Sequence, residues 1–277
     1  MALASAFLFG AMSVALRMAL QRDPDAARGT IATVSAALVV ALVAAAAETP
    51  SRGLHLSGAW PFLLAGLLSP GAAQILVTVA IRESGSSRVS MIFGTAPLVS
   101  VTIALLFLNE PASAPLIAGA VLVVGGGVLL ARERRRPAHL KRLGLVFAFA
   151  GATLFAIRDN LVRHLAVGST TVPPAVAAAA ALLGGTVLIA VWARQWINRR
   201  WLGFLPAGVL FGASYVTLFE AYYRGRVTVV APLVAIESLV GVGLSALLLR
   251  DSEFVGKRLV FGALLIVAGG ALIGAFR

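Results

Sequence analysis

The sequence predicts an all-α polytopic membrane protein in which ten transmembrane helices form two inverted five-helix repeats. Three observations predict this fold: a very apolar composition, ten apolar runs of membrane-spanning length, and an internal repeat. The 277 residues are 60% hydrophobic and 12% charged, with a mean hydropathy of +0.96, whereas soluble proteins are roughly 45–50% apolar and about 25% charged. Because the chain has no cysteine, a disulfide framework and a thiolate metal site are excluded.

Ten apolar runs are long enough to cross a bilayer, which requires about 20 residues at a rise of about 1.5 Å each. In chain order they cover residues 2–20, 30–47, 59–81, 89–108, 112–131, 143–163, 172–193, 202–223, 227–249 and 255–275. They lack the alternation of a membrane β-barrel, so we predict helices. Tryptophan prefers the headgroup level, and the runs are flanked by Trp60, Trp192, Trp196 and Trp201. The first run has no basic segment before it, so we interpret it as a permanent helix rather than a signal peptide.

The basic residues are divided unevenly between the two sides of the membrane. The loops after the first, third, fifth, seventh and ninth runs carry sixteen of the 23 Lys and Arg residues: Arg22, Arg28, Arg82, Arg88, Arg132, Arg134, Arg135, Arg136, Lys141, Arg142, Arg194, Arg199, Arg200, Arg250, Lys257 and Arg258. The other side carries Arg52, Arg163, Arg224, Arg226 and Arg277. We call these sides the arginine-rich face and the opposite face. Because cytoplasmic loops are enriched in Lys and Arg, the bias predicts that both termini lie outside.

This topology explains the net charge of +12 without nucleic-acid binding. The densest basic stretch, residues 132–142, joins two spans and leaves no room for a domain that reads nucleic acid. We expect this loop to lie against anionic lipid. Arginine predominates over lysine, and Ala and Gly are abundant, which suggests a GC-rich bacterial genome and hence a bacterial cell membrane.

An internal repeat relates the two halves of the chain at an offset of about 141 residues. The matching pairs are Gly10–Arg17 with Gly151–Arg158, Phe62–Gly66 with Phe204–Gly208, Glu110 with Asp251, Gly119-Ala120 with Gly262-Ala263, and Gly126-Gly127 with Gly269-Gly270. Five matches in order at a nearly constant offset are not expected by chance. They predict a first repeat over residues 1–131 and a second over residues 143–277, joined by the basic loop at 132–142.

The number of helices in each repeat determines how the repeats are oriented. Since five is odd, the second copy enters the membrane from the opposite side. Such inverted repeats are typical of secondary transporters, because exchanging the conformations of the two halves opens the protein to alternate sides. The repeat also places Arg17 and Arg158 at mirrored depths. Either side chain could reach its nearer interface or neutralise the carboxylate of a substrate.

Two tandem five-helix units resemble the EamA family of the drug/metabolite transporter superfamily. The resemblance is carried by Gly10, by Ala96-Pro97-Leu98 through Leu108-Asn109-Glu110, by Gly119–Gly126, by Ala231–Val234 and by Gly262–Gly270, and it covers essentially the whole chain. It implies a cavity lined by the first, third and fourth helices of each repeat. The chain departs from the family pattern at Ser238, where a proline is expected, and at the preceding Glu237. The family's cytoplasmic termini conflict with the charge bias, so the orientation stays open.

Glycine and proline interrupt corresponding helices of the two halves, as in transporter binding sites near the midplane. We expect hinges or helix breaks at Pro70 and Gly71 in run 59–81, Pro97 in run 89–108, Gly212 in run 202–223, and Pro232 in run 227–249. The alternative is that Gly and Pro are simply frequent in membrane helices.

Glu237 is the strongest candidate for a substrate-binding residue. It lies 11 residues after Arg226, which is about 16 Å of helical rise and places it near the middle of the bilayer core. An ionised carboxylate is costly there, so it should face a cavity, pair with a cation or carry a proton. We expect Glu237 to bind a cationic group of the substrate or to exchange a proton. A static ion pair with Arg158 is the alternative.

The other candidate contacts are uncharged or aromatic, apart from Arg158. Phe204, Phe211, Tyr215 and Tyr222 form one face of run 202–223, and packing is the usual role of such a stripe. The predicted substrate-binding set is Glu237, Ser238, Tyr215, Phe211, Gln74, Ser100 and Arg158. Glu220 is predicted to form an interfacial ion pair with Arg224, four residues away.

The fifth and tenth runs are rich in glycine, which lets helices approach closely and suggests packing or a homodimer contact.

The remaining features favour transport over other membrane functions. The three histidines, His55, His139 and His164, are scattered, and there is no nucleotide-binding motif, so no metal site, cofactor or enzymatic activity is expected. No loop is long enough for a sensing domain. We therefore expect a secondary transporter, an exporter of a small metabolite or amino-acid-like solute, with proton coupling as one mode. The alternatives are a membrane-embedded enzyme and a scaffold or receptor that does not transport.

Overall fold

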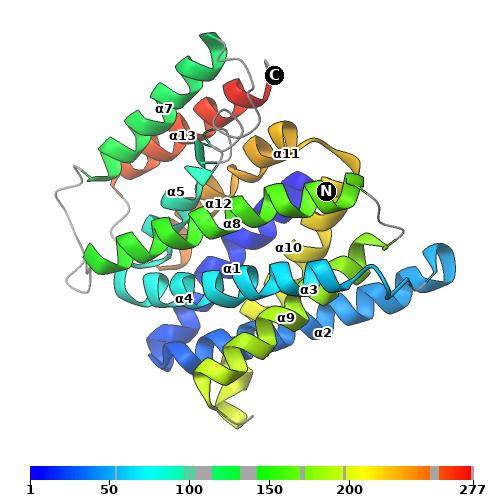
Figure 1. Ribbon diagram of the computed structural model, residues 1–277. Helices are drawn as coiled ribbons and strands as arrows, with labels where there is room; N and C mark the ends of the chain where they lie inside the picture. The colour runs from blue at the N-terminus through cyan, green and yellow to red at the C-terminus, as the bar shows by residue number, and fades with distance from the viewer. Residues whose placement is uncertain are drawn as a thin grey trace.

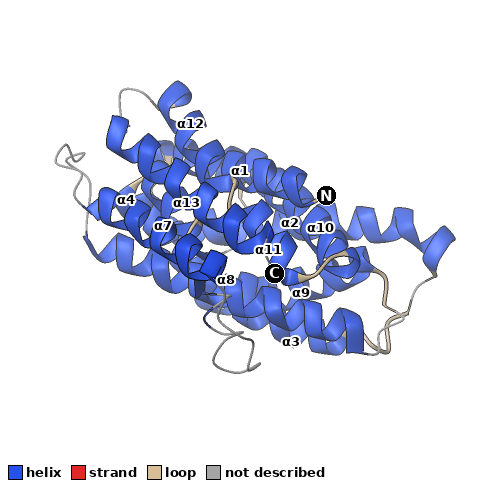
Figure 2. Ribbon diagram, turned by 90° about the horizontal axis from the view of Figure 1, so that it is seen from above, coloured by secondary structure: helices blue, strands red, loops and turns tan. Residues whose placement is uncertain are grey.

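The computed structural model describes residues 1–53, 55–96, 98–99, 102, 114–131, 142–168, 172–195, 198–249 and 256–275. All regular secondary structure in this part of the chain is helical (Figure 2). The first repeat comprises α1 (Ala2–Arg22), α2 (Ala26–Arg52), α3 (Trp60–Gly66), η1 (Leu67–Ala72), α4 (Ala73–Ser84), α5 (Ser86–Phe93) and α7 (Ala114–Ala131). The second comprises α8 (Arg142–Gly168), α9 (Pro174–Ala193), η2 (Arg199–Phe204), α10 (Leu205–Arg224), α11 (Val227–Val234), α12 (Glu237–Leu248) and α13 (Lys257–Ala275).

These helices confirm the predicted all-α membrane fold. Among the described residues, six continuous helical stretches are long and apolar enough to cross a membrane, and shorter apolar helices accompany them. The stretch from α3 through η1 to α4 is one such span, and the stretch from η2 to α10 is another. Residues 97, 100, 101 and 103–108 of predicted run 89–108 and residues 132–141 of the basic loop lie outside the described residues.

The helices pack in pairs that are exchanged by the internal repeat. Helix α1 packs against α10, and their repeat equivalents α8 and α4 pack against each other. Helix α2 packs against its own equivalent α9, and α7 packs against its equivalent α13 (Figure 1). Under the repeat, the α1–α10 contact is therefore equivalent to the α8–α4 contact, and the α2–α9 and α7–α13 contacts are each equivalent to themselves. This is the pattern expected of two repeats related by a pseudo-two-fold axis.

Helices α7 and α13 lie side by side at one edge of the molecule (Figure 1). A Cβ added at Gly126 would lie 2.6 Å from the carbonyl oxygen of Gly262, and one at Gly269 would lie 2.5 Å from that of Gly119. The glycines thus let the two backbones approach within one chain. The predicted role in packing is correct, but this glycine face is occupied internally, which removes the basis for the predicted homodimer contact.

Two helices are interrupted at positions related by the repeat offset. Helix α5 ends before the turn at Gly94-Thr95, and α11 is separated from α12 by a turn at Ala235-Ile236. Position 235 is 141 residues after position 94. Pro232 lies within α11, just before its turn, whereas Pro97 lies outside the described residues.

The third helices of the two repeats differ from the expected symmetry. The chain leaves helical geometry at Ser69, with φ −148° and ψ 116°, directly before Pro70 and Gly71. In contrast, α10 continues through Gly212, so the break expected there is not observed. Gly212 instead brings α10 close to α2, since an added Cβ would lie 2.7 Å from the carbonyl oxygen of Ala37.

Polar contacts join α2 and α9 at both membrane faces. At the opposite face, Glu48 accepts a hydrogen bond of 3.0 Å from the Ala175 backbone N–H. At the arginine-rich face, the Gln195 amide donates to Asp25 at 2.7 Å. Partial burial raises the pKa of Asp25, but the hydrogen bonds from Gln195 and the Arg28 backbone N–H bring that pKa below its ordinary value. These contacts hold the central helix pair at its two ends.

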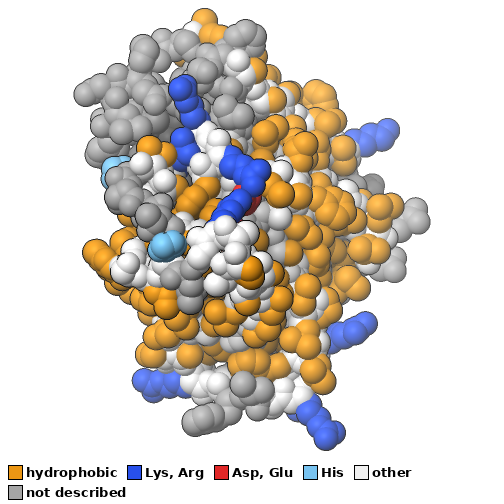
Figure 3. Space-filling model, turned by 90° about the vertical axis from the view of Figure 1, so that its right-hand side faces the viewer, with side chains coloured by type: hydrophobic (Ala, Val, Ile, Leu, Met, Phe, Trp, Pro, Cys, Tyr) orange, Lys and Arg blue, Asp and Glu red, His pale blue; other side chains and the backbone are white. Residues whose placement is uncertain are grey.

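A second polar cluster lies at the opposite face. Arg52 forms ion pairs with Glu48 at 2.6 Å and with Glu220 at 3.2 Å, and Glu220 also pairs with Arg224. The predicted Glu220–Arg224 pair is therefore confirmed. Figure 3 shows one side of the molecule, where blue basic side chains and a red acidic one gather within a largely hydrophobic surface. Exposed apolar side chains beside few charges are expected of a surface that faces lipid.

Candidate functional site

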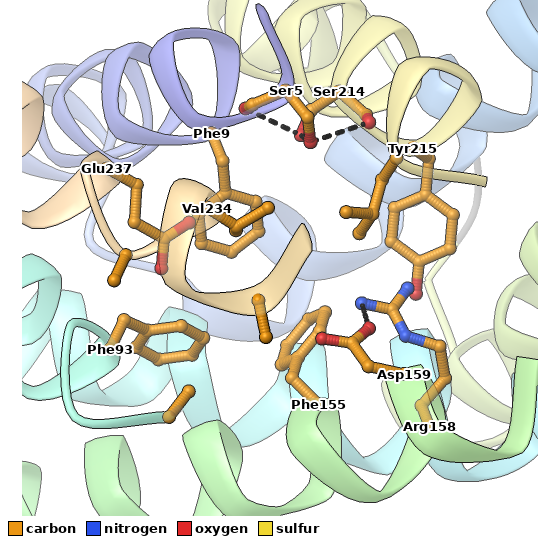
Figure 4. A pocket seen from close by; sticks show the side chains of 14 residues that line it. Ser5, Phe9, Phe93, Phe155, Arg158, Asp159, Ser214, Tyr215, Val234 and Glu237 are labelled. Carbon is orange, nitrogen blue, oxygen red and sulfur yellow. Dashed lines mark hydrogen bonds and ion pairs between the residues drawn. The ribbon is translucent and has the colours of Figure 1, made fainter. Parts of the chain in front are cut away.

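A small cavity lies between α1, α5, α8, α10 and the break that separates α11 from α12 (Figure 4). Its lining includes three buried charged residues, Arg158, Asp159 and Glu237. The cavity volume is about 40 Å³, enough for a few water molecules and well below the roughly 300 Å³ at which small-molecule pockets begin. In this conformation the cavity is too small for a metabolite.

Glu237 reaches the cavity because of the helix break. It is the first residue of α12 and follows the turn at Ala235-Ile236. Its side chain is 5% exposed, and it forms neither a hydrogen bond nor an ion pair with any described residue. Ser238, beside it, donates a hydrogen bond of 2.8 Å to the Ala235 carbonyl within the turn. Ser238 therefore stabilises the break, while the Glu237 carboxyl group has no partner in the described part of the chain.

Arg158 and Asp159 form a second charged group across the cavity from Glu237 (Figure 4). The Arg158 guanidinium is 2% exposed and pairs with Asp159 at 2.8 Å. It also lies 4.6 Å from the ring centroid of Tyr215 and 5.0 Å from that of Phe155, within the range of cation–π attraction. The sequence alternative of a static Arg158–Glu237 pair is not observed, because Asp159 takes that place.

The ionised charges of these three side chains do not cancel. Arg158 contributes one positive charge, and Asp159 and Glu237 each contribute a negative charge. Because Asp159 already compensates Arg158, one negative charge at Glu237 is left for a proton or a cationic ligand.

Aromatic rings form much of the remaining wall. Phe9 lies 5.5 Å from Phe93 and 5.7 Å from Phe155, measured between ring centroids, and Phe93 lies 5.5 Å from Phe155. Figure 4 draws these rings between Glu237 and the Arg158–Asp159 pair. Phe211 packs behind this wall, with its ring centroid 5.0 Å from that of Tyr215. It supports the cavity rather than lining it.

Two hydroxyl contacts join helices around the cavity. The Ser5 and Ser214 hydroxyls lie 3.0 Å apart and link α1 to α10. The Tyr215 hydroxyl lies 3.4 Å from that of Ser69, at the break in the third helix. Tyr215 therefore has its ring in the cavity wall and its hydroxyl against the irregular backbone of η1, so it connects the cavity to that break.

The predicted residues are distributed unequally around this cavity. Glu237, Arg158 and Tyr215 line it, whereas Phe211 and Ser238 act from behind the wall. Gln74 is fully buried in α4 and is not among the lining residues. Ser100 lies outside the described residues. Within the described residues, no group of His, Asp and Glu has an arrangement suited to a metal ion.

Arg17 and Arg158 are equivalent in the repeat but make different contacts. Arg17 is buried, and its Nη1 donates to the carbonyl oxygens of Ile81 and Arg82 at 3.3 and 2.8 Å. In the second repeat, Arg163 donates to the carbonyls at Tyr222 and Tyr223, at 2.8 and 3.3 Å. These acceptors are the equivalents of 81 and 82 at an offset of 141. Arg163 therefore performs the structural role of Arg17, which leaves Arg158 available to the cavity.

Comparison with family models matches residues 1–132 and again residues 142–275 to the EamA-like transporter family. The chain belongs to the EamA-like transporter family. This membership confirms the resemblance found in the sequence and makes the protein a multi-pass membrane transporter with a small-molecule substrate.

Similarity to solved structures agrees with the fold of this EamA-like transporter. One, described as "Crystal structure of protein", is similar with a TM-score of 0.69 and 20% sequence identity, over 98% of this chain and 94% of that chain. At that identity the likeness shows the fold alone. The comparison with curated proteins gave no match.

Proposed function

We propose that this EamA-like transporter is a proton-coupled exporter of a small amino-acid-like solute that carries an ammonium group. The observation that carries the proposal is Glu237, a buried carboxyl group in the cavity wall with no ion-pair partner among the described residues. The membrane is proposed to be the cell membrane of a bacterium, with the basic loop at 132–142 against anionic lipid.

Glu237 supports coupling because its negative charge needs compensation. A bare carboxylate buried away from water is strongly unfavourable. The group is therefore stable in the membrane when it carries a proton or when it pairs with the ammonium group of a solute. Since one carboxyl group cannot do both, solute binding releases a proton and proton binding releases the solute. Exchange of this kind couples the two fluxes in opposite directions.

The rest of the cavity supports a solute with a second polar end. Arg158 is the cation available to a solute carboxylate, and Asp159 keeps it compensated when no solute is bound. Rings of Phe9, Phe93 and Phe155 would pack on the carbon skeleton between the two ends. The small volume of the present cavity agrees with a closed state that opens by alternating access.

Transport into proteoliposomes, measured with a panel of radiolabelled amino acids and monoamines, tests the proposal. Solute uptake should increase when the vesicle interior is more acidic than the medium, because protons then leave as solute enters. Glu237→Gln should reduce this uptake by at least tenfold. Glu220→Gln is the matched control, because Glu220 forms ion pairs at the membrane face and should leave transport nearly unchanged. Equal transport by Glu237→Gln and the unmodified protein would show that the proposal is wrong.

A further inference from the structure

The cavity wall divides into two groups when the repeat offset of 141 residues is applied to it. Four lining residues are exchanged among themselves: Phe93 with Val234, and Ala96 with Glu237. These four belong to the two broken helices and lie where the halves meet. A residue pair that the pseudo-two-fold operation maps onto itself stays central when the two halves exchange conformations. Glu237 therefore remains in the cavity in both conformations.

The other lining residues have equivalents that do not line the cavity. Tyr215 and Ser214 on α10 correspond to Gln74 and Ala73 on α4, and Ala231 on α11 corresponds to Ser90 on α5. The three equivalents are buried, with Gln74 and Ala73 fully covered and Ser90 3% exposed. They come from helices that lead from the centre toward the arginine-rich face.

The polar equivalents on α4 and α5, Gln74 and Ser90, have unmade hydrogen bonds. Among the described residues, neither amide atom of Gln74 has a hydrogen-bond partner, and the Ser90 hydroxyl has none either. A buried polar group without a partner is energetically costly, so such groups are rare in native structures. This observation is independent of the repeat, and it includes both side chains among the buried polar groups of the described residues that lack a hydrogen-bond partner. Their partners are expected in a different conformation.

The half of the molecule that contains these groups is closed in this structure. The Ser86 and Ser245 hydroxyls lie 2.9 Å apart and join α5 to α12. Gly241 of α12 packs directly on Ser90, and Arg17 holds the end of α4 against α1. The segments that would have to separate are thus in contact along the route from the centre to the arginine-rich face.

We propose that a second, mirrored cavity opens around Glu237 toward the arginine-rich face, and that Gln74 and Ser90 form its polar wall and hydrogen-bond the solute there. The proposal rests on alternating access in the proposed function. The solute then meets different side chains in the observed and the mirrored cavity, and Glu237 belongs to both. An amide and a hydroxyl can each donate to a carboxylate, and each can donate to or accept from an uncharged polar group, so this half-site holds the solute by hydrogen bonds.

The mirrored cavity is also wider than the observed one. At the positions that correspond to Phe9, Phe155 and Tyr215, the chain has Ala150, Val14 and Gln74. Smaller side chains at these three wall positions leave more space and remove three of the four aromatic rings, so that Phe93 remains. A solute therefore meets an aromatic, charged wall on one side of the membrane and a roomier polar wall on the other.

Cysteine accessibility tests the proposal, because the chain contains no cysteine of its own. Single variants Gln74→Cys, Ser90→Cys and Ser214→Cys are exposed to a membrane-impermeant methanethiosulfonate reagent in right-side-out and in inverted membrane vesicles. Exposed reference cysteines, Arg199→Cys at the arginine-rich face and Ser51→Cys at the opposite face, identify which side the reagent reaches. Ala80→Cys is the matched control, since Ala80 is buried on α4 and its equivalent, Ala221, does not line the cavity.

We expect Gln74→Cys and Ser90→Cys to react only in the vesicles in which Arg199→Cys reacts. Ser214→Cys should react with the reagent only in the vesicles in which Ser51→Cys reacts. Ala80→Cys should react in neither vesicle preparation. Proteins that elute as a single species from a sizing column are scored. The proposal is overturned if either Gln74→Cys or Ser90→Cys stays unreactive from the arginine-rich face or reacts from the opposite one. Labelling needs no solute, so its failure is distinct from the Glu237→Gln transport result.

Discussion

At the scale of single residues, the charge arrangement around Arg158 determines what the cavity is able to bind. Arg158 is one of the largest fully buried side chains, and its compensation comes from the neighbouring Asp159. Because Asp159 is adjacent in the chain, it compensates the positive charge of Arg158 whether or not the cavity is occupied. Glu237 is thereby free to respond to protons and solutes. The proposed proton coupling depends on Asp159, rather than Glu237, compensating Arg158.

Removing both carboxylates should show how strongly Arg158 depends on them. In Asp159→Asn alone, Glu237 is the nearby acid that can compensate Arg158. In the double variant with Glu237→Gln, the buried guanidinium has no counter-charge, and such a loss destabilises a protein by about 3–5 kcal/mol. We expect thermal unfolding in detergent to show a much lower midpoint for the double variant than for either single one. Additive small shifts would contradict the charge assignment.

The sequence predicts three of the cavity residues and misses the others for physical reasons. Glu237, Arg158 and Tyr215 are recognisable because polar side chains in apolar runs need partners. Asp159 carries the same signal, but its position beside Arg158 gives no indication of which acid compensates the arginine. Phe9, Phe93 and Ser5 are ordinary residues in apolar helices, so only the three-dimensional packing reveals their place. The exchange of roles between Arg17 and Arg163 is likewise invisible, since the two differ by five residues from the repeat register.

At the scale of helices, glycine and proline either interrupt a helix or allow two helices to pack closely, and composition alone does not distinguish the two roles. Glycine and proline marked both the break at Ser69-Pro70 and the continuous helix at Gly212. The difference lies in what faces each residue, because Gly212 contacts a neighbouring backbone. The repeat offset is the better guide, as the turns at positions 94 and 235 show. Paired breaks leave Glu237 and Ala96 beside irregular backbone at the centre.

Two neighbouring glycines in α7 provide a matched test of helix packing. An alanine Cβ at Gly126 would lie 2.6 Å from the Gly262 carbonyl oxygen, whereas one at Gly125 would have no atom within 4 Å. Overpacking of this kind typically costs about 1–3 kcal/mol, while glycine to alanine in an open helix position gains up to about 1 kcal/mol.

We therefore expect Gly126→Ala to lower the unfolding temperature in detergent and Gly125→Ala to leave it unchanged or raise it. Equal shifts in the two variants would contradict the packing of α7 against α13 within one chain.

At the scale of the whole molecule, the repeat explains more than the composition does. Sixty per cent hydrophobic residues identify a membrane protein, but they do not separate a transporter from a receptor. The predicted odd number of helices in each repeat, the paired contacts of α1 with α10 and α4 with α8, and the family match are the observations on which the proposed alternating access rests. The observed cavity lies in one half of the molecule, and the proposed mirrored cavity, with Gln74 and Ser90 in its wall, lies in the other. Glu237 belongs to both.

The most direct test of this account is proton release upon solute binding. Purified protein in weakly buffered detergent solution is titrated with the amino acid or monoamine that proteoliposomes transport best, while a pH-sensitive dye records protons. Because a single carboxyl group exchanges a proton for an ammonium group, we expect release of about one proton per bound solute and none from Glu237→Gln. Binding by the unmodified protein without proton release, or equal release from Glu237→Gln, would contradict the central role of Glu237.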